Sequence, residues 1–350
     1  IPRSPETVRT LDDLPRLPST FKQDLRDHYP FGRPGHRFHN AYGYGLFTGG
    51  LGMHHGAERV GAAVIPASTG NTARQALLIR DLQPDGIACT PSYLLTIADQ
   101  LAADGCDPRR TSLRYAILGA EPWSEAMRQQ IEERMGLKAV DIYGLSEVIG
   151  PGVACECHEA QDGLHIHEDH FLPEVVDPET GEPLPPGTYG ELVFTTLTKE
   201  AFPVIRYRTG DIAALYPEPC RCGRTLVRMS RVKGRADDML IVRGVNVFPS
   251  EVEFQLLQVA ELAPHYQIVV DRPGAQDRLT VQVEPAEAMV RTWDGFNPDG
   301  EPVREFQDRV KRHLGSALGL QVEVAIVPSR TLPRSEGKAV RVVDRRQVMA

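Results

Sequence analysis

Residues 163–171, G-L-H-I-H-E-D-H-F, bring together side chains that commonly bind metal ions. The core of this stretch is His165-x-His167-x-Asp169-His170, which has the spacing that a metallo-hydrolase uses to hold two zinc ions. Such an enzyme also needs further histidines and a bridging carboxylate downstream. The histidines that follow are only His265 and His313. We therefore do not expect a dinuclear hydrolase.

Four cysteines form two close pairs, in C-E-C-H at 155–158 and C-R-C-G at 220–223. Three thiolates and one imidazole, or four thiolates, suit a closed tetrahedral zinc site. The predicted ligands are Cys157, Cys220, Cys222 and His165. Cys155 or His158 could replace one of them, and the alternative is reduced cysteines in surface loops. A disulfide is disfavoured in the cytoplasm, the compartment expected for this chain.

Composition limits the class of protein. The chain has 350 residues, long enough for two domains, with 41% hydrophobic and 25% charged residues. Its net charge of −8 argues against a broad phosphate-binding surface, so nucleic acid is not an expected partner. No apolar run reaches the roughly 18 residues of a membrane helix, and we recognise no signal peptide. We expect a cytoplasmic protein.

Hydrophobic periodicity predicts two kinds of structure in the first two thirds of the chain. Between residues 61 and 143, short apolar strands alternate with amphipathic helices, which is typical of a parallel α/β sheet. The strands are expected at 64–66, 87–89 and 115–118, and the helices at 71–82, 92–103 and 124–136. Residues 163–231 consist of strands and turns and predict a small β subdomain.

A smaller α+β domain is expected after Gly234. The sequence predicts strands at 239–242, 266–270, 278–284 and 321–327, and a helix at 302–317. A second helix should open at Ser250, where S-E-V-E has the spacing of a capping box. The polar stretch ending in G-R-A-D-D is a credible hinge. We therefore predict domains at 1–234 and 235–350.

Four short motifs contain residues that could act on a nucleotide, although each alone could be an ordinary loop. D-I-Y-G-L-S-E at 141–147 would place Glu147 at the carboxyl end of a strand, where it could hold Mg²⁺. Y-R-T-G-D ends in Asp211, whose oxygens could accept hydrogen bonds from a ribose diol. K-G-R-A-D-D-M at 233–239 and S-E-G-K at 335–338 are charged stretches that could equally be solvated loops.

The order and spacing of these motifs resemble those of the adenylate-forming superfamily. G-A-E-P at 119–122 comes first, and the four motifs above follow in the expected order. Within the superfamily, the chain most resembles phenylacetate–CoA ligases. The blocks that carry this likeness are H-N-A-Y-G-Y-G-L-F-T-G-G, E-L-V-F-T-T-L-T-K-E-A, R-G-V-N-V-F-P and L-A-P-H-Y-Q-I-V-V. The resemblance extends from about residue 10 to residue 346.

This resemblance implies a large N-terminal α/β domain with a β subdomain and a small mobile C-terminal α+β domain. It implies that an aromatic carboxylate reacts with Mg-ATP to give an acyl-adenylate, from which coenzyme A displaces AMP. Lys338 would bridge carboxylate and phosphate, and Glu147 would hold the Mg²⁺. The implied nucleotide-binding residues are Gly119, Ala120, Glu121, Pro122, Asp141, Ile142, Tyr143, Gly144, Asp211 and Arg235.

The same likeness implies a hinge at Asp237 and a loop at Gly244 that approaches coenzyme A. The implied pocket for the aromatic acid consists of Tyr42, Phe47, Met53, Ala120, Ile142 and Pro151. Met53 departs from the family, which has a smaller residue there, so the acid could be phenylacetate or another aryl acid. Two rival functions are loading of a carrier-protein thiol and binding without catalysis. A homodimer is a further expectation.

Two other departures from the family bear on function. His167 stands where relatives have tryptophan, and this one change creates the hydrolase-like pattern. The family's phosphate loop, rich in glycine, serine and threonine, is absent near Gly32–Arg33 together with some tens of residues. Either the gene lacks this block, or the 350 residues are only the ordered part of a longer chain in which the loop is mobile, and we favour the second explanation.

Overall fold

A computed structural model describes residues 35–45, 47–235, 240–243, 245–273, 276–293, 295–334 and 341–346. Within these ranges the chain forms two compact units. The first unit contains residues 35–122 and 129–232, and the second contains residues 123–128 and 233–346. Asp237, Gly244 and Lys338, predicted from the family resemblance, lie outside the described residues.

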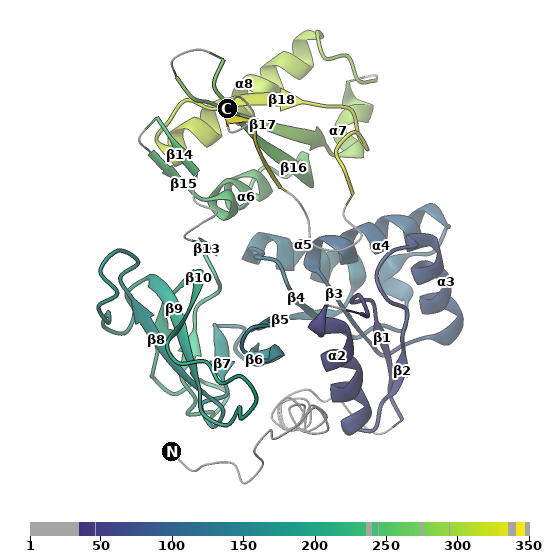
Figure 1. Ribbon diagram of the computed structural model, residues 1–350. Coiled ribbons are helices and arrows are strands. Elements are labelled where there is room, and N and C mark those ends of the chain that lie inside the picture. The colour runs from purple at the N-terminus through teal and green to yellow at the C-terminus, as the bar shows by residue number, and fades with distance from the viewer. Residues whose placement is uncertain are drawn as a thin grey trace. The chain divides into compact units, whose positions relative to one another are not determined.

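The first unit is built on a sheet whose strand order is β11-β12-β7-β6-β5-β4-β3-β1-β2 (Figure 1). Its parallel part confirms the predicted α/β alternation, because apolar strands are separated by helices that pack against the sheet. The parallel strands are β1 (Arg37–Asn40), β2 (Ala63–Ile65), β3 (Gly86–Cys89), β4 (Tyr115–Gly119) and β5 (Lys138–Leu145). The helices between them are α2 (Thr48–Arg59), α3 (Thr72–Leu82), α4 (Pro91–Ala103), the short η2 (Pro108–Arg110) and α5 (Glu125–Met135).

Antiparallel strands extend this sheet beyond β5. They are β6 (Gly150–Glu156), β7 (Leu164–Ile166), β12 (Arg228–Met229) and β11 (Leu215–Tyr216). Strands β8 (Phe171–Val176), β9 (Gly190–Thr196) and β10 (Tyr207–Ala213) pair in a separate antiparallel sheet. Residues 163–231 therefore consist of strands and turns as predicted, but they divide between two sheets: β7, β11 and β12 extend the main sheet, and β8 to β10 belong to the separate one. Side chains of β7 and β12 lie in one hydrophobic cluster with side chains of the separate sheet. Burial in this cluster stabilises β7 and β12 in their place in the main sheet.

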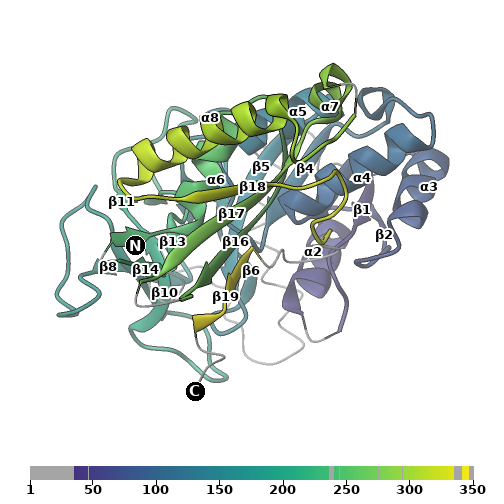
Figure 2. The same ribbon diagram turned by 90° about the horizontal axis from the view of Figure 1, so that it is seen from above.

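The second unit contains a sheet of order β18-β17-β16-β19, with helices α6 and α8 on one face (Figure 2). Helix α8 packs against the sheet because Val303, Phe306, Val310 and Leu314 recur at helical spacing and are buried. The strands of this sheet are β16 (Leu262–Asp271), β17 (Arg278–Pro285), β18 (Glu323–Ile326) and β19 (Val342–Asp344). Strands β14 (Leu240–Val242) and β15 (Val245–Val247) pair with each other in a two-stranded sheet, and the short β13 (Gly234–Arg235) belongs to neither. The helices are α6 (Pro249–Leu257), α7 (Glu287–Thr292) and α8 (Glu301–Leu318). Among the described residues, no helix is both long and apolar enough to cross a membrane.

The start of α6 corrects the predicted capping box. Helix α6 begins at Pro249, with Phe248 in the extended N-cap position and no side-chain cap. Ser250 therefore lies inside the helix, where its hydroxyl donates a hydrogen bond to the carbonyl of Lys233. Proline at the first helical position explains the earlier start, because its missing N–H would have no helical partner there.

Candidate functional site

The turn after β4 lies beside the end of β5. Gly119 pairs with Ile142, and a Cβ at Gly119 would be only 2.3 Å from the Ile142 carbonyl oxygen, so this approach requires glycine. Ala120 follows with a positive φ of 68°. Glu121 then accepts a 2.7 Å hydrogen bond from the Ser92 amide at the start of α4. The carboxyl ends of two parallel strands thus meet where ligands bind in open α/β sheets.

Two predicted nucleotide-binding motifs meet in the structure. The Tyr143 hydroxyl donates a 2.5 Å hydrogen bond to Oδ2 of Asp211, from a position 68 residues earlier in the chain. Tyr143 lies on β5 and Asp211 on β10, so this contact joins the two sheets of the first unit. Gly144 follows, where a Cβ would be 1.9 Å from the Gly150 carbonyl oxygen, so glycine permits the approach of β6.

Glu147 lies in the turn between β5 and β6, and its side chain is exposed. The turn is closed by hydrogen bonds from the amides of Val148 and Ile149 to the Leu145 carbonyl. The Glu147 carbonyl accepts a 2.9 Å hydrogen bond from Nζ of Lys199. Burial lowers the pKa of Lys199, and the nearby Glu147 carboxylate partly offsets this effect.

Lys199 is a candidate site residue that sequence reasoning did not single out. It belongs to the block E-L-V-F-T-T-L-T-K-E-A, which carried part of the family resemblance, but a lone lysine in a loop gives no chemical signal. The segment is fixed on its N-terminal side by the Leu197 amide, which donates to the His170 carbonyl, and by a 2.7 Å contact between His170 and Thr198. These contacts hold the lysine beside the Glu147 turn.

The residues predicted to surround the aromatic acid are largely brought together. Tyr42, Met53 and Ile142 are buried in one hydrophobic cluster. The ring of Phe47 lies 5.9 Å from that of Tyr42, and the Phe47 side chain is partly exposed. Pro151 packs closely against Gly52 of α2. A Cβ added at Gly52 would lie only 2.4 Å from Cγ of Pro151. Ala120 is exposed, at the turn already described.

Two polar residues support this pocket from within. Asn40, which sequence analysis did not select, donates 2.8 Å hydrogen bonds to the Tyr44 hydroxyl and to the Gly50 carbonyl. It therefore ties the loop after β1 to the first turn of α2. Tyr42 is held in its neutral form, because burial and the neighbouring Cys89 and Glu121 raise its pKa well above the usual value.

The predicted metal ligands also come together. One ligand atom from each of Cys157, His165, Cys220 and Cys222 lies within 4.8 Å of all the others. Cys155 instead packs in the hydrophobic cluster of Tyr42 and Ile142. Within the described ranges, the groups close enough to hold a metal do not combine His165 with His167, Asp169 or His170, so the hydrolase-like set is not assembled.

The second unit contains Arg235, which is half-buried on β13. Two ion pairs flank residues 335–340, the segment that includes Lys338. Arg334 donates to both oxygens of the buried Glu284, at 3.0 and 2.7 Å. Arg341 lies 3.4 Å from the buried Glu253 and 4.4 Å from the ring centre of Tyr266. Both buried carboxylates were missed, because the sequence alone does not distinguish them from surface glutamates.

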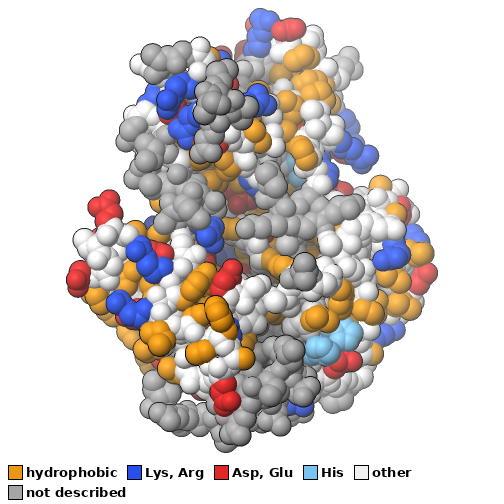
Figure 3. All heavy atoms as spheres, viewed as in Figure 1, with side chains coloured by type: hydrophobic (Ala, Val, Ile, Leu, Met, Phe, Trp, Pro, Cys, Tyr) orange, Lys and Arg blue, Asp and Glu red, His pale blue; other side chains and the backbone are white. Residues whose placement is uncertain are grey.

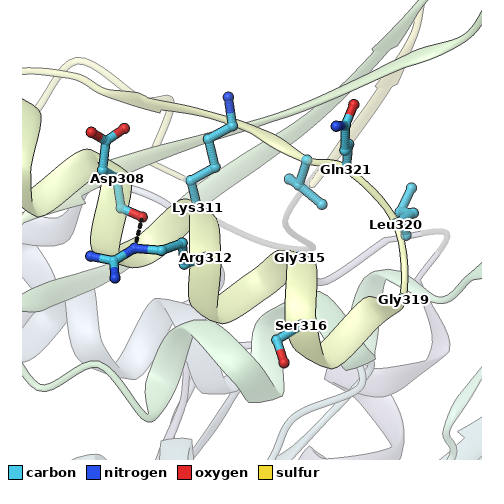
Figure 4. A pocket seen from close by; sticks show the side chains of 9 residues that line it. Asp308, Lys311, Arg312, Gly315, Ser316, Gly319, Leu320 and Gln321 are labelled. Atoms are coloured by element: carbon cyan, nitrogen blue, oxygen red, sulfur yellow. Dashed lines mark hydrogen bonds between the residues drawn. The ribbon is translucent and has the colours of Figure 1, made fainter.

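A cavity of about 770 Å³ lies along α8 and the turn before β18 (Figure 4). Its polar side chains do not converge. Lys311 and Gln321 point to one side, Ser316 points to the other, and Arg312 turns back to the Asp308 carbonyl. None of the predicted site residues that the structure describes lines this cavity, and we assign it no role.

The surface carries an apolar patch over β8 to β10 (Figure 3). Phe202 and Ile205 are 81% and 80% exposed, values unusual for large apolar side chains. Leu172 and Leu197 are also exposed in this region.

Comparison with known proteins agrees with this geometry. The AMP-binding enzyme family matches residues 34–197, and the AMP-binding enzyme C-terminal domain family matches residues 244–346. A phenylacetate-coenzyme A ligase of Thermus thermophilus is 48% identical, with 98% of this chain and 89% of the relative covered. A phenylacetate-coenzyme A ligase of Escherichia coli is 46% identical, with 99% of this chain and 88% of the relative covered.

Solved structures show the same fold. A 2-hydroxyisobutyryl-CoA ligase in the postadenylation state, in complex with R3-HIB-AMP, matches with a TM-score of 0.89 at 27% identity. That match covers 98% of this chain and 72% of the other. A benzoate CoA ligase from Burkholderia xenovorans matches with a TM-score of 0.69 at 18% identity, over 96% of this chain and 65% of the other, which supports the fold alone. The chain belongs to the phenylacetate–coenzyme A ligase family of AMP-binding, adenylate-forming enzymes.

Proposed function

We propose that the protein joins an aromatic carboxylate, phenylacetate or a close relative, to coenzyme A at the expense of ATP. The observation that supports this best is the hydrogen bond between Tyr143 and Asp211, which assembles two nucleotide-binding motifs from distant parts of the chain. The phenylacetate-coenzyme A ligases matched over nearly the whole chain supply the substrate class.

The reaction has two steps because a carboxylate resists attack by a thiol. A carboxylate oxygen first attacks the α-phosphorus of ATP, pyrophosphate leaves, and an acyl-adenylate forms. The thiol of coenzyme A then attacks the acyl carbon, its proton is lost, and AMP leaves with the bonding electrons. The matched 2-hydroxyisobutyryl-CoA ligase has been solved in postadenylation and thioesterification states, which supports such a division for that protein.

We assign the first step to Lys338, which lies outside the described residues. The carboxylate and the phosphate are both anions, so their approach needs a cation that interacts most strongly with the developing charge. The ion pairs of Arg334 with Glu284 and of Arg341 with Glu253 support this role, because they anchor the chain on both sides of the lysine segment.

The nucleotide would occupy the carboxyl ends of β4 and β5. Residues 119–122 and 141–144 would line the adenine, and Asp211 would accept hydrogen bonds from the ribose hydroxyls while Tyr143 orients its carboxylate. Arg235 is a further residue that would contact the nucleotide. The close approach of Gly119 to Ile142 supports this placement. Because Gly119 has no side chain, the adenine would meet backbone atoms at the ends of these strands.

We propose that Glu147 holds the Mg²⁺ of Mg-ATP. An exposed carboxylate is the hard oxygen ligand that Mg²⁺ prefers, and Lys199 contacts the carbonyl of Glu147 and not its carboxylate oxygens. The metal would neutralise phosphate charge. A zinc ion held by Cys157, His165, Cys220 and Cys222 would have no step in this reaction, because none of these four residues belongs to the proposed nucleotide or acid sites.

The acid would lie against Tyr42, Phe47, Met53, Ala120, Ile142 and Pro151. Met53 is buried against the same cluster as Tyr42 and would narrow the space for the ring. We propose the functional lobes 1–234 and 235–350, a hinge at Asp237 and a CoA-side loop at Gly244. The two compact units support this division.

Coenzyme A is the proposed acceptor in preference to a carrier protein, because the matched relatives that cover most of this chain are named as coenzyme A ligases. The free cysteines are compatible with a reducing compartment, so we retain a cytoplasmic location. A homodimer stays a prediction, for which the exposed Phe202 and Ile205 provide an apolar surface to test.

A panel of aryl acids tests the proposed function. The full-length protein is incubated with Mg-ATP, coenzyme A and each acid, and thioester and AMP are quantified together. We expect equal amounts of thioester and AMP, with phenylacetate or a substituted relative as the best acid. Absence of thioester across the panel contradicts the proposal, and thioester formed only on a carrier protein favours the rival acceptor.

A further inference from the structure

We propose that Cys157, His165, Cys220 and Cys222 bind one zinc ion, and that this ion fastens the short edge strands of the main sheet. This zinc site is independent of the ligase reaction. Cys157 directly follows β6, His165 lies on β7, and the other two cysteines lie in the loop between β11 and β12. Their side chains are largely buried, so the four ligands form an enclosed site.

The distances fit a tetrahedral zinc ion. Zinc lies about 2.3 Å from sulfur and about 2.0–2.1 Å from nitrogen. A regular tetrahedron with these bonds has sulfur–sulfur edges of about 3.8 Å and sulfur–nitrogen edges of about 3.6 Å. Sγ of Cys157 lies 3.8 Å from Sγ of Cys220, and Sγ of Cys222 lies 3.6 Å from Nε2 of His165. A disulfide requires about 2.05 Å between sulfurs, so Cys157 and Cys220 do not form one, and Cys222 is also a free cysteine.

The loop that supplies two of the ligands has a conformation suited to chelation. Gly223 has a φ of +91° and donates its amide to the Cys220 carbonyl at 2.9 Å. The Cys220 amide in turn donates to the Arg224 carbonyl at 3.0 Å. This tight C-R-C-G turn brings two thiols to one side of the loop without depending on a metal. Glycine is suited to the position because side chains rarely adopt its backbone conformation.

The charge of the proposed site is partly balanced by the protein. Three thiolates and a neutral imidazole around Zn²⁺ leave a net charge of about −1. Nη1 of Arg224 lies 3.4 Å from Sγ of Cys222, where a guanidinium can donate to a metal-bound thiolate. A second arginine, Arg221, donates to the Ala160 carbonyl at 2.8 Å and holds the loop against the segment that follows β6.

The position of the site suggests its physical role. Strands β11 and β12 have two residues each and β7 has three, so their ladder hydrogen bonds are few. Strands this short are marginal unless other contacts hold them. A zinc ion would connect the β11–β12 loop to β6 and β7 and so fix the edge of the sheet. Strand β11 closely follows β10, which contains Asp211, so the zinc would also steady the segment after the proposed nucleotide site.

Metal analysis and X-ray absorption of the full chain test this directly. Protein purified without metal-affinity resin or chelator should contain about one zinc per chain, and no other transition metal in comparable amount. The absorption spectrum should show three sulfur neighbours near 2.3 Å and one nitrogen neighbour near 2.0 Å. Protein with less than about half an equivalent of zinc, or with fewer than three sulfur neighbours, would overturn the proposal.

Matched variants identify the ligands. Cys220→Ser and His165→Ala should each lower zinc affinity by at least about 10–100-fold, the loss already seen when only outer-shell partners are removed. Cys155→Ser and His158→Ala are the controls, because both residues neighbour the tetrad but lie outside it, and they should keep zinc at the wild-type level. Loss of zinc in a control and retention in a ligand variant would refute the assignment.

A measurement on the unchanged protein covers the case in which a ligand variant does not fold. Removing zinc with a chelator should lower the melting temperature, and adding zinc back should restore it, while Mg²⁺ should not. A melting temperature that is the same with and without bound zinc would contradict the fastening role. This outcome is independent of ligase activity, so it does not depend on whether an acid substrate is known.

Discussion

At the scale of single residues, the contact between Tyr143 and Asp211 fixes the orientation of the carboxylate that we propose as the ribose acceptor. The Tyr143 hydroxyl occupies Oδ2 of Asp211 at 2.5 Å, and the Asp211 amide donates to the Thr209 hydroxyl. One carboxylate oxygen and the backbone amide of Asp211 thus form hydrogen bonds within the protein. The carboxylate would thereby be oriented before a nucleotide binds.

Replacing Asp211 with asparagine should weaken ATP binding. Loss of a charged acceptor for the ribose hydroxyls costs about 1.5–3 kcal/mol, or roughly 10–100-fold in the dissociation constant. Calorimetric titration with Mg-ATP in the absence of acid measures this loss. Tyr143→Phe should cause a smaller loss, because it removes only the hydroxyl that orients the carboxylate.

Asp177→Asn provides the matched control in the same unit. Asp177 accepts hydrogen bonds from backbone amides in the turn after β8 and is not part of the proposed site. Its substitution should leave the dissociation constant of ATP unchanged. Equal weakening in both aspartate variants would show that Asp211 acts through folding and not through contact with the nucleotide.

Replacing Lys338 with alanine should separate the two half-reactions. Loss of one cation directed at developing charge costs about 3–4 kcal/mol, or roughly 10²–10³ in the rate of adenylation. Thioester formation from pre-made acyl-adenylate should survive, because we assign the lysine to the first step only. Rapid-quench assays of each half-reaction measure the two rates. Lys311→Ala, which removes an exposed lysine paired with Glu323 on the second unit, is the control.

At the scale of elements, Glu284 is the anchor for the chain that leads to Lys338. This buried carboxylate at the end of β17 accepts hydrogen bonds from Arg334 and from the amides of Arg330 and Leu332. Burial raises the pKa of Glu284, but these hydrogen bonds outweigh it, so the pKa is lowered overall. One ion pair therefore connects the sheet of the second unit to the segment before the lysine.

Replacing Glu284 with glutamine should destabilise the second unit by about 3 kcal/mol, because Arg334 loses its buried partner. The lowered pKa means that the carboxylate stabilises the fold above its unfolded pKa of about 4.3. This contribution is lost as the pH falls through the folded pKa. Urea unfolding at pH 7 and at about pH 4 should show a smaller pH effect in the variant than in the wild type.

Glu261→Gln tests whether any glutamate–arginine pair would behave in this way. Glu261 and Arg309 are 2.7 Å apart on the same unit but remain exposed, so their pair should contribute less than about 1 kcal/mol. Both tryptophans, Trp123 and Trp293, belong to the second unit, so their fluorescence reports its unfolding. Similar losses in the two variants would contradict a special role for Glu284.

The sequence predicted elements wherever hydrophobic periodicity was strong. The helix expected at 302–317 is α8 at Glu301–Leu318, and the strand expected at 115–118 is β4 at Tyr115–Gly119. It did not predict that β7 and β12 join the main sheet. Strands of two or three residues have too few side chains to show a period, and their pairing depends on burial against distant residues.

The residues of the candidate site were likewise predicted only in part from the sequence. The sequence suggested the metal tetrad, because closely spaced cysteines have a chemistry of their own. It gave no sign of Asn40, Lys199 or Glu284. A polar residue becomes important through burial and through partners far away in the chain, such as the 50 residues that separate Glu284 from Arg334. Only the folded structure shows such partners.

At the scale of the whole molecule, the alignments with two relatives are longer than this chain. They extend over 398 and 394 positions, more than the 350 residues of this chain, so each contains positions that have no counterpart here. This supports the expected absence of a phosphate loop near residues 32 and 33, which lie outside the described ranges.

We predict that the natural protein is several kilodaltons heavier than the 38.7 kDa of this sequence, because it retains the loop that receives the phosphates of ATP. Intact mass spectrometry of the protein from its source measures this difference. A mass of 38.7 kDa would mean that the gene lacks the block, and would favour a protein that binds the ligands without catalysis.

An acyl-adenylate is expected to form on this protein before coenzyme A takes part. The most direct measurement is exchange of labelled pyrophosphate into ATP by the full-length protein, with an aryl acid present and coenzyme A omitted. We predict exchange that requires both Mg²⁺ and the acid and is fastest with phenylacetate or a close relative. Absence of acid-dependent exchange across the panel of aryl acids would mean that no aryl-adenylate forms on this protein.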